Sequence, residues 1–373
     1  MSERVFRAPG RVEIGGNHTD HQRGRVLAAA IDLETTCIAS ENGSRVVNIV
    51  SEGFGAITAD LSDLSVREDE KDTPAAAIRG VAAWFSNNGH AIGGFDGRVS
   101  SDVPLGSGLS SSAAFEVVIG NAFRGLFGAG VSDLEIALAG QFAENNYFGK
   151  PSGLMDQSAS SIGGLNKIDF RDPRYPVITP VRAALEGYAL CVVDTGGNHA
   201  DLTPDYAAIP AEMKAVAAFF GKEFLSELDA GDFYGALGEL RHLGDRPLLR
   251  AIHFFEDNAR VSLQAEALEN GRVDEFLRLV KESGLSSLKN LQNVFSSANP
   301  SEQGLTLALA LCERVLGGEG AYRVHGGGFA GTILAFVPED MTDRFRRRMS
   351  EVFGESCCHF LKINPLGGRE VEM

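Results

Sequence analysis

Apolar and polar positions in the first half of the chain follow two spacings. Short runs that are apolar or alternate apolar and polar residues indicate strands, and runs with apolar residues three and four apart indicate helices. The predicted strands are 26–33, 46–50 and 95–103. The predicted helices are 75–86, 112–127 and 134–147. Strands and helices therefore mix in this half, which favours the α+β class.

The second half of the chain is mainly helical in pattern. Residues 209–295 place Ala, Leu, Glu and Phe at helical spacing, and a short apolar strand is predicted at 189–194. Pro176 and Pro180 interrupt the pattern between the two halves. We therefore expect two domains, 1–180 and 181–373.

Charge and composition narrow the class of partner. The 373 residues include 34 Lys and Arg against 50 Asp and Glu, a net charge of −16. Such a chain lacks the basic stripe that binding to nucleic acid requires, and it is poorly suited to anionic membranes. Five scattered cysteines and the lack of an apolar run of about 18 residues predict a cytoplasmic protein that is neither exported nor anchored in a membrane.

A glycine- and serine-rich segment separates the predicted strand 95–103 from the predicted helix 112–127. Its residues are Gly106, Ser107, Gly108, Leu109, Ser110, Ser111 and Ser112. The start of a helix leaves backbone N–H groups unpaired and attracts anions, so this order of elements suits a phosphate. The hydroxyl groups can cap the helix, bind phosphate oxygens or reach a divalent metal. A serine-capped helix without a ligand is the alternative.

Other nucleotide-binding patterns fit less well. The chain contains no G-x-x-x-x-G-K-[ST] sequence, which excludes a P-loop nucleotidase. Residues 326–331 formally satisfy G-x-G-x-x-G, the dinucleotide fingerprint, but that motif must open a helix. The apolar run 332–337 that follows is more typical of a strand, so we do not expect hydride transfer.

A polar cluster near the N-terminus offers groups that bind hydroxyls. Asn17, His18 and Asp20 combine hydrogen-bond donors and acceptors at short spacing, as recognition of a polyol requires. A metal site formed by His18, Asp20 and His21 is the alternative. Two histidines three residues apart without a third imidazole are a weak zinc signal.

The polar cluster near the N-terminus, the glycine- and serine-rich segment and the glycine cluster 326–331 follow one another along the chain. In this order and spacing, they resemble the three signature motifs of the GHMP small-molecule kinases. The first is similar to the galactokinase signature, roughly G-R-x-N-x-I-G-E-H-T-D-Y. The matching residues are Gly10, Arg11, Gly16, His18, Thr19 and Asp20. Residues 153–157, Gly-Leu-Met-Asp-Gln, resemble the family's Gly-x-Met-Asp-Gln. The resemblance implies a two-lobed fold with an N-terminal lobe like ribosomal S5 domain 2, a ferredoxin-like C-terminal lobe and an active site between them.

The resemblance also implies residue roles for phosphoryl transfer from ATP with Mg²⁺. Asp156 would receive or orient the proton of the sugar 1-hydroxyl, and Arg11 would pair with Asp156. The glycine- and serine-rich segment would hold the nucleotide, and Ser112 and Glu144 would bind the metal. The implied sugar contacts are Asn17, His18, Asp20, Gly153 and Tyr206. Without the motifs, Asp156 would be taken for a helix cap and Glu144 for a solvated helix residue.

Departures from the galactokinase signature include three polar residues. Glu13 replaces its asparagine, Asn17 its glutamate and His21 its tyrosine. An amide at position 17 keeps one acceptor for the galactose 6-hydroxyl, but a carboxylate would bind it more strongly. An amide also tolerates a C6 carboxylate, so we expect a galactokinase and keep a galacturonate 1-kinase as the alternative.

A non-catalytic sugar sensor is a further alternative from a different class. Known sensors related to galactokinase lose part of the Ser-Ser-Ser-Ala-Ala sequence. That sequence is complete at residues 110–114, and Asp156 is present, which favours an enzyme. We expect a monomer or weak homo-oligomer whose partners are a small-molecule sugar and ATP.

Overall fold

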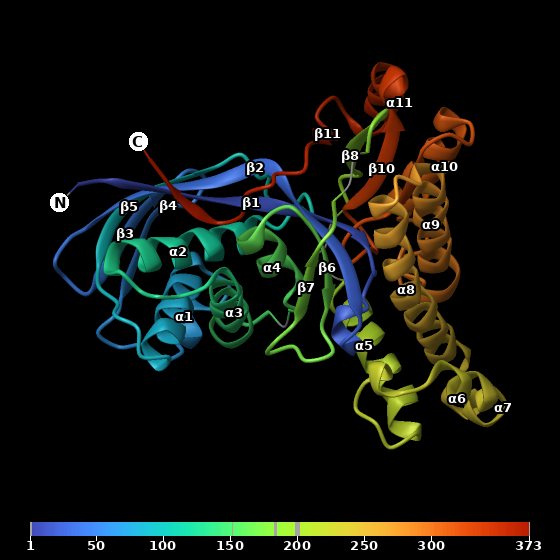
Figure 1. Ribbon diagram of the computed structural model, residues 1–373, viewed down its shortest axis with the longest axis horizontal. Helices are drawn as coiled ribbons and strands as arrows, with labels where there is room; N and C mark the ends of the chain where they lie inside the picture. The colour runs from blue at the N-terminus through green and yellow to red at the C-terminus, as the bar shows by residue number, and fades with distance from the viewer. Residues whose placement is uncertain (1, 151, 183–184, 198–201, 373) are drawn as a thin grey trace. The chain divides into compact units, whose positions relative to one another are not determined.

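The computed structural model describes residues 2–150, 152–182, 185–197 and 202–372. The chain forms two compact units (Figure 1). The first contains Met1–Arg11, Ala29–Gly164 and Ile363–Met373, and the second contains Val12–Ala28 and Leu165–Lys362. This division differs from the expected single boundary near residue 180. The chain passes between the units four times, because two long strands run through both and the C-terminal segment returns to the first unit.

A mixed sheet forms one layer of the first unit. Its strand order is β12-β1-β2-β5-β3-β4. Strands β3 and β5 are parallel, whereas β1 with β12, β2 with β5 and β3 with β4 are antiparallel. The bounds are β1 Arg4–Gly15, β2 Arg25–Glu41, β3 Val46–Ser51, β4 Gly55–Asp60, β5 Phe95–Ser101 and β12 Arg369–Val371. The three strands predicted in this half are therefore confirmed.

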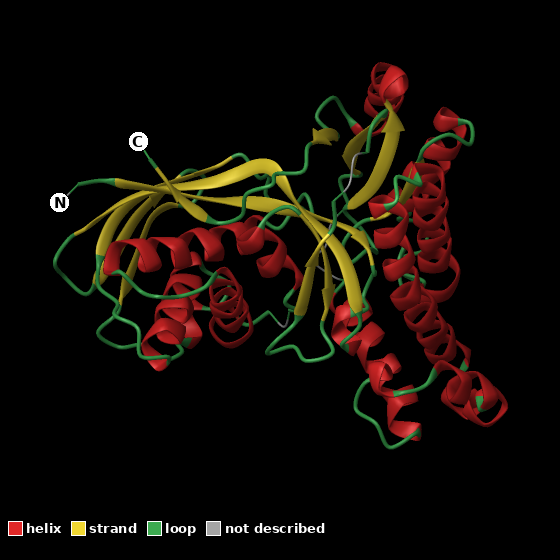
Figure 2. Ribbon diagram, viewed as in Figure 1, coloured by secondary structure: helices red, strands yellow, loops and turns green. Residues whose placement is uncertain are grey.

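Helices pack on this sheet, as Figure 2 shows for the first unit. They are α1 Pro74–Asn87, α2 Ser111–Phe127, α3 Asp133–Ala143 and α4 Met155–Ile162. Apolar residues of the sheet and helices share one buried core that includes Phe85, Phe95 and Phe123. A capping box between Ser132 and Glu135 starts α3. Apolar periodicity predicts α1 and α2 to within one residue and the start of α3 to within one residue, but it places the end of α3 four residues too late and does not predict α4.

The second unit has its own sheet in the order β11-β8-β10-β9, with every pair antiparallel. A hairpin of β6 and β7 belongs to the larger, eight-stranded sheet, because β6 also pairs with β2. These strands are β6 Leu165–Asp169, β7 Val177–Pro180, β8 Tyr188–Asp194, β9 Ala321–Val324, β10 Thr332–Pro338 and β11 Cys358–Leu361. Because β10 directly follows the glycine cluster 326–331, that cluster does not open a helix, as predicted.

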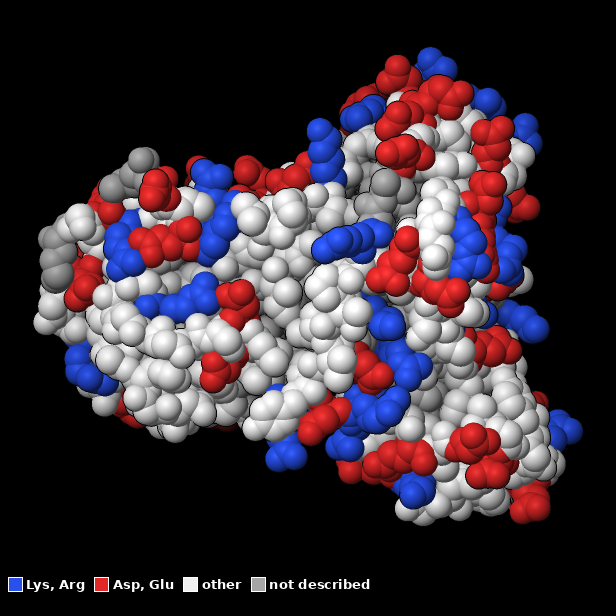
Figure 3. Space-filling model, in the orientation of Figure 1, with Lys and Arg blue, Asp and Glu red and all other residues white. Residues whose placement is uncertain are grey.

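Helices make up the rest of the second unit. They are α5 Thr203–Phe219, α6 Ala230–Gly235, α7 Leu237–Leu240, α8 Asp245–Glu269, α9 Val273–Ser286, α10 Gly304–Leu316 and α11 Thr342–Phe353. Over the described residues, none of the helices is both long and apolar enough for a membrane span. Acidic and basic side chains are interspersed on the face drawn in Figure 3.

Candidate active site

The predicted phosphate-binding segment forms a loop between β5 and α2. Gly106 and Gly108 have φ angles of 73° and 71°, a conformation that glycine adopts without strain. Ser110 precedes α2, and among the described residues no side chain caps the first turn of this helix. The N–H groups at the start of α2 are therefore available to an anion. Ser112 is exposed in this turn, whereas Ser107 and Leu109 are buried.

Asp156 lies in the first turn of α4 and forms a two-pronged ion pair with Arg11 of β1. The guanidinium Nε donates to Oδ1 at 2.7 Å, and Nη2 donates to Oδ2 at 2.8 Å. The third guanidinium nitrogen, Nη1, donates to the carbonyl of Gly108. Ser110 Oγ also donates to Asp156 Oδ2, at 2.5 Å. The structure thus brings the two residues expected to be catalytic together at the end of the phosphate loop.

These contacts determine the charge of Asp156. Burial alone would raise its pKa, but the positive charge and hydrogen bonds of Arg11, together with the hydrogen bond from Ser110, outweigh burial and lower the pKa below its usual value. The carboxylate is therefore ionised at neutral pH. It is available as a hydrogen-bond acceptor, although the low pKa makes it a weak base.

Glu144 belongs to a group of buried polar side chains that includes Gln157, the residue after Asp156. It starts a π-helical turn, Glu144–Phe148, that continues α3. Lys150 Nζ donates to its Oε1 at 3.2 Å, and Gln157 Nε2 donates to its Oε2 at 2.8 Å. Gln157 Nε2 also donates to Glu116 Oε2 at 2.9 Å. Burial, and secondarily the charge of Glu144, raises the pKa of Glu116 well above its usual value.

The donor set expected for Mg²⁺ has suitable chemistry. A carboxylate oxygen of Glu144 and the hydroxyl of Ser112 are the hard ligands that Mg²⁺ prefers. The Lys150 side chain that pairs with Glu144 is 61% exposed, whereas the side chain of Glu144 is 4% exposed. Within the described ranges, no three His, Cys, Asp or Glu side chains are grouped to hold a metal ion, so the alternative site at His18, Asp20 and His21 gains no support.

Asn17 is the most enclosed of the expected sugar-binding residues, with an exposed fraction of 0%. Its amide Nδ2 donates to Glu13 Oε1 at 3.0 Å and to the Gly326 carbonyl at 2.7 Å. Its Oδ1 accepts from Asn293 Nδ2 at 2.8 Å and from Ser287 Oγ at 3.3 Å. Both ends of the amide are therefore engaged by the protein.

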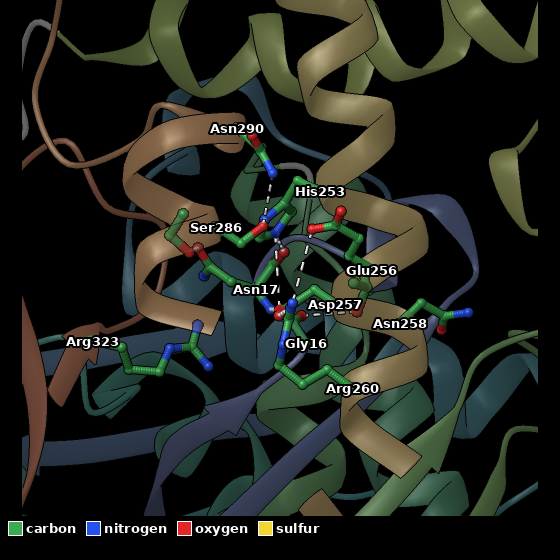
Figure 4. A network of polar contacts seen from close by, with 12 residues as sticks. Gly16, Asn17, His253, Glu256, Asp257, Asn258, Arg260, Ser286, Asn290 and Arg323 are labelled. Atoms are coloured by element: carbon green, nitrogen blue, oxygen red, sulfur yellow. Dashed lines mark hydrogen bonds and ion pairs between the residues drawn. The ribbon is translucent and has the colours of Figure 1, made fainter. Parts of the chain in front are cut away.

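The backbone of Asn17 is held from helix α8, as Figure 4 shows. Its N–H donates to Asp257 Oδ2 at 3.0 Å, and its carbonyl accepts from His253 Nε2 at 2.9 Å. His253 Nδ1 then contacts Ser286 Oγ of α9 at 2.9 Å, and Arg260 Nη1 donates to Asp257 Oδ1 at 2.6 Å. Residue 17 is therefore fixed through its main chain as well as its side chain.

His18 joins the first motif to the third. Its Nε2 lies 2.9 Å from the carbonyl of Gly327, so Nε2 carries the proton and donates. Burial, followed by the nearby charge of His21, lowers the pKa of His18 to about 3, and the ring is neutral at physiological pH. Its other nitrogen, Nδ1, is buried without a hydrogen-bond partner among the described residues. Nδ1 can therefore accept a hydrogen bond from a ligand.

The other expected sugar contacts have different surroundings. Asp20 lies in a short helical turn and accepts from the N–H of His21 at 2.9 Å. Gly153 is half-buried in the segment just before α4. Tyr206, in the first turn of α5, donates its hydroxyl to the carbonyl of Gly328 at 2.8 Å. Its ring packs so closely on Gly327 that a Cβ there would lie 2.6 Å from the ring carbon Cε1.

Comparisons with known proteins agree with this geometry. Residues 1–41 match the galactokinase galactose-binding signature, and residues 76–164 match the GHMP kinases N terminal domain. Galactokinase from Lactococcus lactis, solved in complex with galactose, is 26% identical, with a TM-score of 0.85 over 100% of this chain and 95% of that one. These matches show that the chain is similar to GHMP kinases of the galactokinase type.

More distant GHMP kinases share the fold of this kinase. The D-glycero-D-manno-heptose 1-phosphate kinase of Bacteroides thetaiotaomicron is 18% identical, with a TM-score of 0.66 over 100% of this kinase and 99% of that chain. The mevalonate kinase of Methanococcus jannaschii is 16% identical, with a TM-score of 0.68 over 97% and 98%. The two-lobed GHMP architecture expected from the motifs is confirmed.

Sequence reasoning missed several polar residues around the motifs of this kinase. Glu116 follows the serine-rich loop on the buried side of α2, where a charged residue among alanines and valines is an unusual feature that could have drawn attention. Arg323 and Asn293 contact the first motif from about 300 residues further along the chain. Such distant partners leave no periodic signal in one sequence.

Proposed function

We propose that this kinase transfers the γ-phosphoryl group of ATP to the anomeric hydroxyl of galactose, giving galactose 1-phosphate. The observation that carries the proposal is the ionised Asp156 held by Arg11 next to the phosphate loop. The match of residues 1–41 to a galactose-binding signature supports the choice of sugar. So does the likeness to an enzyme solved with galactose.

Asp156 has the role of aligning the attacking hydroxyl. Phosphoryl transfer depends mainly on positioning and charge neutralisation, with little covalent chemistry for the protein to perform. An ionised carboxylate accepts a hydrogen bond from the hydroxyl and takes its proton as the bond to phosphorus forms. Arg11 fixes the carboxylate with two hydrogen bonds, and its positive charge lies close to the transferred group.

The loop 106–112 and the start of α2 are the proposed site for the ATP phosphates. Free backbone N–H groups and the helix dipole stabilise the negative charge there without a large basic side-chain cluster. Ser112 and Glu144 would hold Mg²⁺. When bound, the ion neutralises charge on the phosphate oxygens.

The polar residues of the first motif are the proposed sugar contacts. A neutral His18 with a donating Nε2 leaves Nδ1 free to accept from a sugar hydroxyl. Asp20, Gly153 and Tyr206 are proposed contacts from the resemblance, and the hydroxyl of Tyr206 donates to the carbonyl of Gly328.

Galacturonate is the second candidate, because an amide stands at position 17 in place of the glutamate of the galactokinase signature. A substrate panel decides between the two. Purified protein is assayed with ATP, Mg²⁺ and galactose, galacturonate, N-acetylgalactosamine or glucose, and phosphorus NMR identifies the product. We expect galactose to give the highest kcat/KM and a 1-phosphate. A higher value for another sugar would reject the proposed substrate.

Asp156→Asn tests the mechanism in the same assay. The amide keeps the shape of the side chain but cannot take a proton, so turnover should be lost while galactose binding changes by only a few fold. Undiminished turnover would remove Asp156 from its proposed role.

A further inference from the structure

Two of the departures from the galactokinase signature, Glu13 and Asn17, exchange the same two residue types between two positions. The signature has asparagine and then glutamate at the positions of Glu13 and Asn17, and this chain has them in reverse order. The two side chains touch, since Asn17 Nδ2 donates to Glu13 Oε1 at 3.0 Å. One carboxylate and one amide are therefore present in either arrangement.

The carboxylate of Glu13 has a buried counter-ion. Arg323 of β9 donates from Nη2 to Glu13 Oε1 at 2.7 Å and from Nη1 to the carbonyl of Ile14 at 2.9 Å. Glu13 and Arg323 have exposed side-chain fractions of only 4% and 0%. A buried charge without its partner is strongly destabilising, so Arg323 requires a carboxylate within reach.

Position 17 is within reach of the same guanidinium. Asn17 Nδ2 and Arg323 Nη2 both donate to one oxygen, Glu13 Oε1, so the two nitrogens lie at most two hydrogen-bond lengths apart. A glutamate at 17 with an asparagine at 13 would again place one carboxylate beside Arg323.

A third departure lies on the same strand. The signature has isoleucine where this chain has Gly15, the last residue of β1. A Cβ at that position would lie 2.0 Å from Oε1 of the buried Gln264, so the side chain of α8 occupies the space that a larger residue would need. The end of β1 therefore packs directly against the side chain of Gln264 on α8.

Asn17 has no hydrogen-bonding capacity left for a sugar. A primary amide has two N–H groups and one oxygen with two lone pairs. Both N–H groups donate, to Glu13 and Gly326, and the oxygen accepts two hydrogen bonds. Through these bonds the residue links the sugar motif to the glycine cluster 326–331 and to the segment that follows α9.

We propose that Asn17 is a positioning residue, and that the acidic group of the signature has moved to Glu13, where it serves as the counter-ion of Arg323. The selectivity of this kinase for the C6 substituent is then set by residues other than 17. This inference deepens the proposed function and relies on it only for the identity of the sugar.

A double-mutant cycle on Glu13→Asn and Asn17→Glu tests the exchange, with the melting temperature Tm as the first readout. Glu13→Asn leaves Arg323 unpaired, and Asn17→Glu places two carboxylates beside one guanidinium, so each should lower Tm by several degrees. The double variant restores one carboxylate and should recover most of the loss. Glu3→Asn, which breaks an exposed pair with Arg98, is the matched control and should leave Tm unchanged.

The kinetic readout separates a positioning residue from a sugar ligand. We expect Asn17→Glu to leave the ratio of kcat/KM for galactose and galacturonate unchanged. A single Asn17→Glu variant that keeps its Tm and gains selectivity for galactose would show that residue 17 binds the sugar, which overturns the proposal. The proposal would also be overturned if the double variant lost as much Tm as the two single variants together.

A second pair of variants applies if the exchange variants are insoluble. Glu13→Gln should lower Tm by leaving Arg323 unpaired, and adding Arg323→Met should restore much of it. No recovery would reject the counter-ion role. Because Tm is measured without substrate, this result stands apart from the substrate panel, and a failure of the proposed galactose activity would be recognised separately.

Discussion

Ser110 Oγ donates a 2.5 Å hydrogen bond to Oδ2 of Asp156. The residue at the end of the phosphate loop therefore contacts the carboxylate that we propose to align the sugar hydroxyl. In the sequence, Ser110 was expected to bind the nucleotide. In the structure its hydroxyl is used to orient Asp156.

Ser110→Ala tests this contact. A hydrogen bond to a charged group contributes about 1.5–3 kcal/mol, so we expect kcat to fall by roughly tenfold or more while the KM for ATP changes little. Steady-state kinetics with ATP and galactose each varied give both values. Ser132→Ala removes a serine hydroxyl at the cap of α3 and should leave kcat unchanged. A rise in the KM for ATP alone would instead assign Ser110 to the nucleotide.

Arg11→Gln should change the pH dependence of the reaction. In the native protein the pKa of Asp156 is lowered, so its carboxylate is lost only as the pH falls through a value below the usual one. Without Arg11, less positive charge offsets the effect of burial, and the pKa of Asp156 rises. The acid limb of the kcat/KM profile should therefore move to higher pH, in addition to a lower maximum. An acid limb at its native position would mean that Asp156 does not control it.

His18 should make stability depend on pH in the acid range. The folded protein takes up the proton of His18 only near pH 3, whereas the unfolded chain takes it up near pH 6.5. Unfolding therefore binds a proton between these values, and the free energy of unfolding decreases as the pH falls from 6.5 toward 3. Thermal unfolding at a series of pH values should show a flatter slope for His18→Asn. An imidazole NMR signal of His18 that titrates near pH 6.5 would contradict the prediction.

Gly327→Ala tests the contact between the third motif and Tyr206. The new methyl group would lie 2.6 Å from the tyrosine ring and must displace it, which breaks the hydrogen bond to Gly328. The displaced tyrosine also loses its proposed contact with the sugar, and loss of one neutral hydrogen bond of about 1 kcal/mol should raise the KM for galactose roughly fivefold. Gly238→Ala, where a Cβ meets no atom within 4 Å, is the control and should behave as wild type. Equal KM values for the two variants would show that Tyr206 does not bind the sugar.

Local features of the sequence predicted much of this structure. The spacing of apolar residues located three strands, β2, β3 and β5, and the helices α1, α2 and α3, because each element buries one face and the pattern repeats within a few residues. It did not locate β1, β4 or α4. The strand, loop and helix around Gly106 to Ser112 followed from the same signal. The pairing of Arg11 with Asp156 came from the motif resemblance alone, since nothing in the spacing connects residues 145 apart.

Contacts between distant residues explain what sequence reasoning missed. The role of Asn17 depends on Asn293 and Gly326, which approach it only after α8, α9 and the second sheet have formed. The division of the chain near residue 180 was expected from two prolines, but long strands β1 and β2 continue through both units. The two compact units are therefore not divided at Pro176 and Pro180.

The backbone of Ser110 has a φ of 60°, in the left-handed region that favours glycine. A serine there costs about 1–2 kcal/mol relative to relaxed backbone, whereas glycine adopts this conformation freely. Glycine at this position would therefore favour stability, whereas serine supplies the hydroxyl that contacts Asp156. A library screened only for heat resistance would enrich Ser110→Gly, and the thermostable enzymes recovered from it would be slow.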